Sequence, residues 1–130
     1  MYRETTRAIQ VTVEPSFMAS ESSPERSRYF WAYRIEIANL GDEAVRVRSR
    51  HWLITDEGGR TEEVQGAGVI GEQPVLKPGE TFTYTSGCPL STPSGIMVGS
   101  YQMQSERGEL FSIAIPPFSL DLPNNSLTLN

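Results

Sequence analysis

The stretch Tyr29-Phe-Trp-Ala-Tyr-Arg-Ile-Glu-Ile-Ala38 decides the fold class of this chain. Its large apolar residues recur at every second position from Trp31 to Ile37, whereas the polar Arg34 and Glu36 occupy the positions between them. A period of two is typical of a β-strand that buries one face and exposes the other. The same period recurs along the rest of the chain, and no long stretch has the 3.6-residue spacing of an amphipathic helix.

Six further stretches show strand periodicity or composition. We expect these strands at residues 9–14, 45–55, about 61–64, around Phe82 and Tyr84, 96–104 and 111–115. Pro15 and the pair Pro116-Pro117 are expected to end the first and last of them, because proline cannot donate to a ladder. Residues 15–28, rich in Ser, Glu and Pro, are expected to form a mobile loop. About seven strands joined by turns favour an antiparallel β-sandwich.

Three local features refine this prediction. Val47 and Trp52 have opposite parity, which predicts a β-bulge between Ser49 and His51 because a strand cannot otherwise change its buried face. Trp31 and Trp52 are expected to face each other in the core. The segment Gly99-Ser-Tyr101 resembles a tyrosine corner, in which the hydroxyl group binds an upstream loop.

Composition places limits on function. The chain has 130 residues, enough for one domain, here assigned to residues 1–121 with a polar tail at 122–130. Its net charge is −5, and its single lysine is Lys77, so binding to nucleic acid or to a membrane surface is not expected. One cysteine, Cys88, and an N-terminus without an apolar signal region favour the cytoplasm.

Several segments resemble the ApaG family. They include residues 29–37, Ser49-Arg-His-Trp52 and Ile54-Thr-Asp56 in the first half of the chain. The second half contributes Gly66-Ala-Gly-Val-Ile-Gly-Glu-Gln-Pro-Val-Leu-Lys-Pro-Gly-Glu80, residues 84–95, Met97-Val-Gly-Ser-Tyr-Gln-Met103 and Pro117-Phe-Ser-Leu-Asp121. The resemblance spans Ile9 to Asp121 and implies an immunoglobulin-like or fibronectin type III-like sandwich. It also implies an association with cobalt resistance and magnesium homeostasis, and a protein-binding role, but no catalytic residue.

The segment Gly66-Ala-Gly68-Val-Ile-Gly71 matches the pattern G-x-G-x-x-G. A dinucleotide site of this kind needs a helix after the third glycine, and Pro74 and Pro78 exclude one. The alternative is a nest of backbone amides that binds an anion. We favour a plain loop, in which the glycines adopt positive φ or permit close packing, because an isolated match without its structural context is weak evidence.

Arginines alternate along the strand at 45–55. Arg46, Arg48 and Arg50 would project from one face up to the expected bulge. We interpret them as an ordinary solvated face offset by Glu62 and Glu63, and the alternative, carried by Arg46 and Arg48, is a docking face for phosphate or an acidic partner. Arg34 would join them only if strands 29–38 and 45–55 paired, and we favour a topology that places those strands in different sheets.

The residues for metal binding and catalysis are few. His51 is the single histidine and is interpreted as a hydrogen-bonded structural residue, and Cys88 as part of a rigid turn. A weak magnesium site could use Asp56, Glu57, Glu62 and Glu63, acids that a solvated hairpin would carry anyway. Ser86, Ser91 and Ser94 lie in no nucleophile motif. We therefore expect no catalytic residue, metal or cofactor.

The sequence thus predicts a non-enzymatic binding or adaptor module whose partner is a protein. The expected surface combines the loop 66–71 with a loop at 85–95. The alternative is a sensor of polyphosphate, diadenosine nucleotide or divalent cation that uses Gly66, Gly68 and Gly71 with Arg46 and Arg48.

Overall fold

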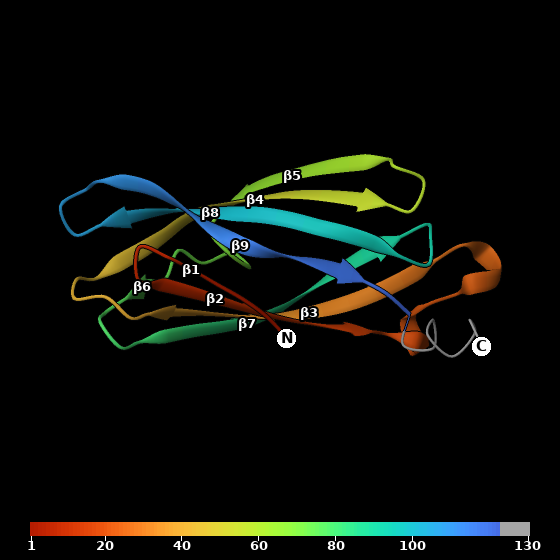
Figure 1. Ribbon diagram of the computed structural model, residues 1–130, viewed down its shortest axis with the longest axis horizontal. Helices are drawn as coiled ribbons and strands as arrows, with labels where there is room; N and C mark the ends of the chain where they lie inside the picture. Colours follow the sequence, from red (N-terminus) through yellow and green to blue (C-terminus); the bar gives the residue numbers. More distant parts are fainter. Residues whose placement is uncertain (123–130) are drawn as a thin grey trace.

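The computed structural model describes residues 1–122, which form nine strands in two antiparallel sheets packed face to face (Figure 1). The first sheet has the order β1-β2-β3-β7, with strands at Tyr2–Thr6, Ile9–Phe17, Tyr29–Asn39 and Thr81–Leu90. The second has the order β5-β4-β8-β9, with strands at Thr61–Ala67, Val45–Asp56, Gly95–Ser105 and Leu110–Leu120. The short β6, Val75–Leu76, pairs with the start of β4. The predicted all-β sandwich is confirmed.

The strands β3 and β4 lie in different sheets, as the favoured immunoglobulin-like or fibronectin-like topology requires. Within residues 1–122 no helix has the length and apolarity needed to cross a membrane. The expected tail at 122–130 falls, apart from its first residue, outside the described residues.

The core consists of the inward-facing residues of both sheets. Trp52 packs against Tyr33 and Phe118, with ring centroids 5.5 and 5.9 Å apart. Trp31 is equally buried but packs against Phe17, at 5.3 Å. The two tryptophans are core residues, as predicted, but they belong to separate aromatic groups and do not form the expected face-to-face pair.

Tyr101 does not form a tyrosine corner. It is fully buried in the middle of β8, and its hydroxyl group contacts the hydroxyl group of Tyr84 in the opposite sheet. In a tyrosine corner the hydroxyl group would instead bind the backbone of a loop a few residues upstream in the chain. The prediction was wrong because Gly99 is small for another reason: the ring of Trp52 covers it.

The predicted bulge in β4 exists, but it lies earlier in the strand. Val47 pairs with Met103 and Ser49 with Gln102, so Arg48 is the extra residue. The parity of β4 therefore changes before Arg50. As a result Arg50 shares the inward face of Trp52, whereas Arg46 and Arg48 are exposed on the outer face.

Proline did not end the first predicted strand. Strand β2 continues through Pro15 to Phe17 and pairs there with β3. Because β1 stops pairing opposite Val13, Pro15 lies at a free edge, where its missing N–H costs no ladder bond. The expected loop 15–28 therefore begins only at Met18 and contains two short 3-10 turns, at Ala19–Glu21 and Pro24–Arg26.

The last predicted strand also continues past its prolines. Ile115 pairs with Gly99 and Phe118 with Met97, so Pro116 and Pro117 lie where β8 has a single residue. This second bulge accommodates two residues that cannot donate to the ladder and still directs Phe118 and Leu120 into the core.

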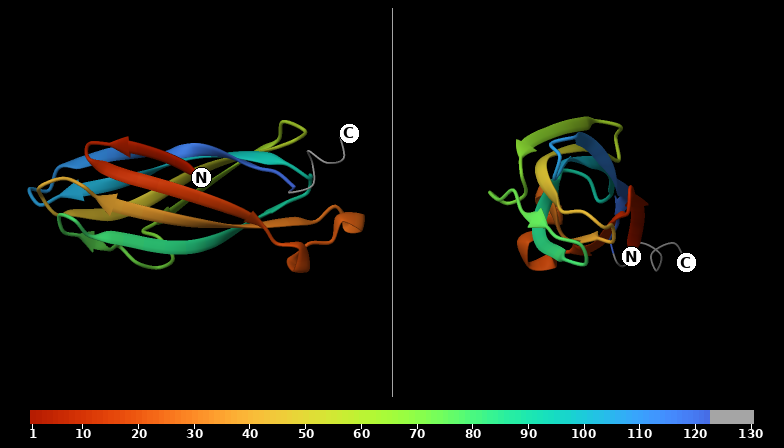
Figure 2. Two further views of the ribbon diagram at one scale, coloured as in Figure 1. Left: turned by 60° about the horizontal axis from the view of Figure 1, so that its bottom comes forward. Right: turned by 90° about the vertical axis from the view of Figure 1, so that its left-hand side faces the viewer.

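The two long sides of the sandwich differ. On one side β1 lies beside β9 (Figure 2), and side chains join them: Tyr2 Oη is 3.0 Å from Ser119 Oγ, and the Ala114 amide donates to Thr6 Oγ1 at 3.3 Å. On the other side the edge strands are β5 and β7, which do not pair with each other. We call this second side, bounded by the edges of β5 and β7, the open side.

Candidate binding surface

The outer edge of β7 presents unpaired backbone groups. Phe30 directs its N–H to Ser22 Oγ and its carbonyl to the Met18 amide, both away from β7. Its partner Pro89 therefore directs its own backbone away from β3, and strand alternation gives Thr81, Thr83, Thr85 and Gly87 the same orientation. Among the described residues, no hydrogen bond reaches these outward amides.

This edge also lacks the usual protection against pairing with another chain. Natural edge strands carry charged residues, prolines or bulges that prevent such pairing. The ten residues of β7, TFTYTSGCPL, contain no charge, and their single proline, Pro89, lies near the end. By contrast, β5 carries Glu62 and Glu63 on the other edge of the open side.

A cleft of about 300 Å³ lies between these edges. Ser86–Pro89 of β7 line one wall, and Glu62 and Val64 of β5 line the other. Behind them lie the buried Tyr33 and Trp52. We call this space the Arg50 cleft, because Arg50 is the basic residue that lines it.

The Arg50 guanidinium group is partly buried and only partly satisfied. Its Nη1 donates to the carbonyl oxygens of Ala67 at 3.3 Å and Gly68 at 3.0 Å. In residues 1–122, no carboxylate lies within 4.0 Å of Arg50, and Nε and Nη2 have no hydrogen-bond acceptor. Burial raises the pKa values of Tyr33 and Tyr84, so neither nearby phenol supplies a negative charge at neutral pH.

The three glycines of the G-x-G-x-x-G pattern have three separate structural reasons. Gly66 makes room for Arg50, since a Cβ atom there would lie 2.8 Å from Nη1. Gly68 has a φ of +61°, and a Cβ atom there would lie 2.0 Å from the Glu72 carbonyl oxygen. Gly71 has a φ of +80° with open space around it. The pattern therefore reflects packing beside Arg50 at Gly66, and a positive φ that favours glycine at Gly68 and Gly71.

The amides of this loop are largely in use. The Gly68 amide donates to the Arg48 carbonyl at 2.7 Å, and the Val69 amide donates to the Glu72 carbonyl at 2.8 Å. Arg46 and Arg48 project from the outer face of their sheet, so the structure does not bring their side chains to the inner face beside Gly66. The basic side chain that does meet the glycine segment is Arg50, which the sequence placed on one face with Arg46 and Arg48 and not among the candidate site residues.

The two predicted loops do not form one surface. Residues 85–90, expected to be a loop, belong to β7, and Cys88 is a buried strand residue opposite Trp31. The remaining turn, residues 91–94, packs against the turn after β4, where Ser94 Oγ donates to Glu57 Oε1 at 2.6 Å. The loop after Gly66 lies near the start of β4, where the Gly68 amide donates to the Arg48 carbonyl, whereas the turn 91–94 lies beyond the end of β4, so the combined site is not assembled.

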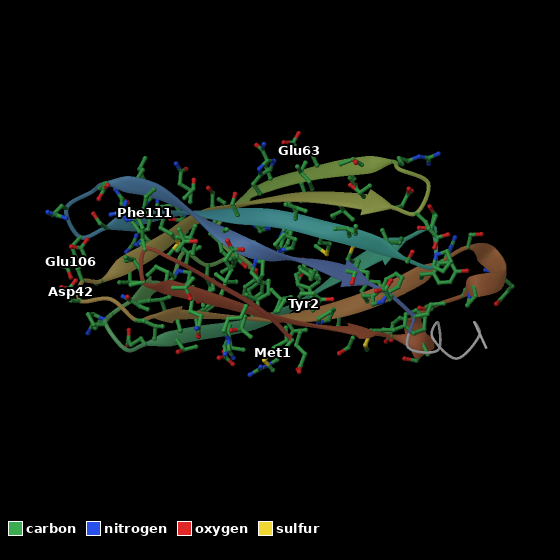
Figure 3. All side chains as sticks on the ribbon, in the orientation of Figure 1. Met1, Tyr2, Asp42, Glu63, Glu106 and Phe111 are labelled. Atoms are coloured by element: carbon green, nitrogen blue, oxygen red, sulfur yellow. The ribbon has the colours of Figure 1, made fainter. Side chains whose placement is uncertain are left out.

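His51 and Glu63 form an exposed contact on the outer face of the second sheet, with 2.5 Å between Nε2 and Oε2. Glu63 points away from the opposite sheet (Figure 3). The hydrogen bond from His51 lowers the pKa of Glu63. The expected offset of Arg46 and Arg48 by Glu62 and Glu63 does not form, because no ion pair in residues 1–122 joins these residues.

The outer face also carries a shallow depression of about 590 Å³. Small polar residues line it, including Ser49, Ser100, Gln102 and Ser112. The acids considered for magnesium do not converge there or elsewhere: in the described part of the chain, no three His, Cys, Asp or Glu side chains are grouped so as to hold a metal ion.

Comparison with known proteins assigns the chain to a family. The model of the ApaG domain, a domain family that also bears the designation DUF525, matches residues 19–105. Protein ApaG of Rhodopseudomonas palustris is 59% identical over 130 residues, which is the full length of both chains. The chain belongs to the ApaG family. Protein ApaG of Bradyrhizobium diazoefficiens is 61% identical over the same length.

A solved structure of a relative agrees with the fold. The crystal structure of an ApaA protein from Bordetella pertussis has a TM-score of 0.88 and 46% sequence identity, and the match covers 90% of this chain and 95% of that one. The resemblance found in the sequence is therefore confirmed over nearly the whole chain. The names of these two relatives give the family and state no activity.

Proposed function

We propose that this protein is a non-catalytic binding module that adds an extended segment of a partner protein to the open edge of β7. The carrying observation is the row of outward, unbonded amides from Thr81 to Gly87 on a strand without charge. A segment that pairs with such an edge gains main-chain hydrogen bonds, and its alternate side chains enter pockets that confer specificity.

The Arg50 cleft supports this proposal. Every second residue of an added strand would point in the same direction as Tyr84 and Ser86, toward the space between the sheets. The cleft begins beside Ser86, so it offers such side chains a place. Expected partners are cytoplasmic proteins, and the family's association with cobalt and magnesium would then act through a partner that handles these ions.

The test uses random dodecapeptides displayed on phage and selected on the immobilised full-length protein. An enriched peptide is then titrated into isotope-labelled protein. We expect shifts and slowed hydrogen exchange at the amides of Thr83, Thr85 and Gly87, because these amides would become bonded to the peptide.

Two proline variants separate the edges. Thr85→Pro removes an outward N–H of β7 without removing a ladder bond to β3. Gln65→Pro makes the matched change on β5. The Gly68 amide donates to Arg48 of β4, so strand alternation directs the backbone of Gly66 and Val64 toward β4 and that of Gln65 outward. We expect Thr85→Pro to weaken peptide binding about tenfold or more and Gln65→Pro to leave it unchanged. Binding that survives Thr85→Pro in a folded variant contradicts the proposal.

A further inference from the structure

We infer that the Arg50 cleft is a carboxylate site, which selects partner segments with an Asp or Glu side chain facing inward. This inference rests on the proposed function and names the chemistry of the partner. It follows from three features of Arg50. Its side chain lies opposite the middle of β7, two of its nitrogen atoms have no acceptor, and Gly66 leaves space for its guanidinium group.

Arg50 lies at the level of the unprotected part of β7. It pairs with Tyr101 on the neighbouring strand, and Tyr101 contacts Tyr84 of β7 across the core. The side chain of Arg50 points inward from its own sheet, so it enters the space between the sheets beside Tyr84 and Ser86. An inward side chain of a strand added at Thr85 would therefore meet the guanidinium group.

The free donors of Arg50 form one edge of its fork. Nη1 donates to the carbonyl oxygens of Ala67, the last residue of β5, and of Gly68, which orients the group. Nε and Nη2 remain, and this edge of a guanidinium group matches the two oxygens of a carboxylate. No anion of the described chain pairs with this half-buried cation, so a carboxylate bound there would gain charge-assisted hydrogen bonds without displacing a native ion pair.

Gly66 makes this orientation possible. A Cβ atom at position 66 would lie 2.8–2.9 Å from the guanidinium atoms, so any larger residue there would displace Arg50 from this orientation. Glu62, the other charged residue of the cleft, lies four residues earlier on β5, about 13 Å along a strand. Glu62 forms no ion pair with Arg50 in the described residues. Its carboxylate would repel an acidic ligand group from its own end of the cleft, which leaves the Arg50 end as the place for such a group.

The test compares two resin-bound heptapeptide libraries that differ only in a central Glu or Gln. The wild-type protein is expected to retain about tenfold more of the Glu library, the scale of charge-assisted hydrogen bonds. Arg50→Gln should reduce this ratio to about one. Arg50→Lys should give an intermediate ratio, because it keeps the charge and loses the fork. Arg48→Gln, which removes the same charge from the outer face, should leave the ratio unchanged.

A second measurement needs no variant. Acetate is titrated into the wild-type protein while the arginine Nε–H resonances are followed, and Arg50 should shift saturably whereas Arg48 should not. Inorganic phosphate in a parallel titration should compete poorly if the site prefers a planar carboxylate. A stronger response to phosphate than to acetate would overturn the assignment to a carboxylate.

The outcomes separate the two proposals. Equal retention of both libraries, lost in Thr85→Pro, would overturn the carboxylate site and support pairing at β7. An acetate response at Arg50 without retention of either library would support the anion site and overturn the peptide proposal. A Glu preference that Arg48→Gln removes as fully as Arg50→Gln would reflect overall charge and overturn the inference.

Discussion

The indole ring of Trp52 lies directly over Gly99 of the neighbouring strand. A Cβ atom at position 99 would lie 2.6 Å from Cε3 of the ring and 2.7 Å from the His51 carbonyl oxygen. Because the backbone oxygen cannot move without disturbing the ladder between β4 and β8, this contact fixes both the residue type at 99 and the position of the largest side chain in its aromatic group.

Gly99→Ala should therefore destabilise the protein by about 1–3 kcal/mol, the usual cost of overpacking a core. Urea unfolding, monitored by tryptophan fluorescence, measures the loss. Gly58→Ala is the control, since a Cβ atom there would meet only Asp56 Oδ1 at 3.4 Å. Equal unfolding midpoints for the two variants would contradict this account of Gly99.

Gly68 and Gly71 should respond differently to substitution by alanine. Both glycines have positive φ, so alanine at either position would add a backbone strain of about 1–2 kcal/mol. Only Gly68 adds a collision with the backbone, where the Glu72 carbonyl lies 2.0 Å from the ideal Cβ position. Gly68→Ala should lose clearly more stability in urea than Gly71→Ala, and the reverse order would show that strain alone decides.

The contact between His51 and Glu63 predicts a local effect of pH. The pKa of Glu63 is lowered in the folded state, so the contact stabilises the fold above the unfolded pKa, and this contribution is lost as the pH falls through the folded pKa. His51→Ala should raise the pKa of Glu63, measured by carboxyl-carbon chemical shifts. Glu109, whose pKa is lowered by Arg7, is the internal control and should not change.

Cys88 should be unreactive in the folded protein. Burial raises the pKa of its thiol to about 11, so about one molecule in a thousand carries a thiolate at pH 8. A thiol-specific disulfide reagent should therefore modify it slowly in native buffer and rapidly in guanidinium chloride. The native rate should rise with pH toward the pKa, and fast native modification at pH 8 would contradict the buried placement.

The sequence predicted the fold through side-chain parity. Trp31 to Ile37 alternate without interruption, and the structure places this face in the core. Prolines were less informative, because Pro15 and Pro116 are tolerated where a strand has a free edge or a bulge. Whether a proline lies at such a place depends on which strands are neighbours, and that is a property of the tertiary structure.

The candidate site was predicted less well. Arg50 has the same parity as Trp52 and Ile54, which could have identified it as inward-facing. A bulge between Ser49 and His51 would not have determined whether the Arg50 side chain points inward or outward. The observed bulge lies at Arg48, before Arg50, so Arg50 points inward with Trp52. The contact between Arg50 and Gly66 joins residues on adjacent strands, so its prediction would have needed the register of β4 and β5. The outward amides of β7 could be predicted only from the order of the strands in the sheet.

The side chains that join β1 to β9 have a consequence for assembly. Tyr2 and Thr6 of β1 bind to β9, which hinders a further strand from entering between these two edges, whereas β5 and β7 on the open side do not pair. Repeated edge-to-edge addition, as in a fibre, needs two sheet edges that can pair with another molecule and that face in opposite directions. A second copy that pairs through the open side would occupy the open side of both molecules, so assembly would stop at a dimer. The contacts of β1 with β9 thus allow β7 to keep an edge that can pair with another strand without the protein forming a fibre.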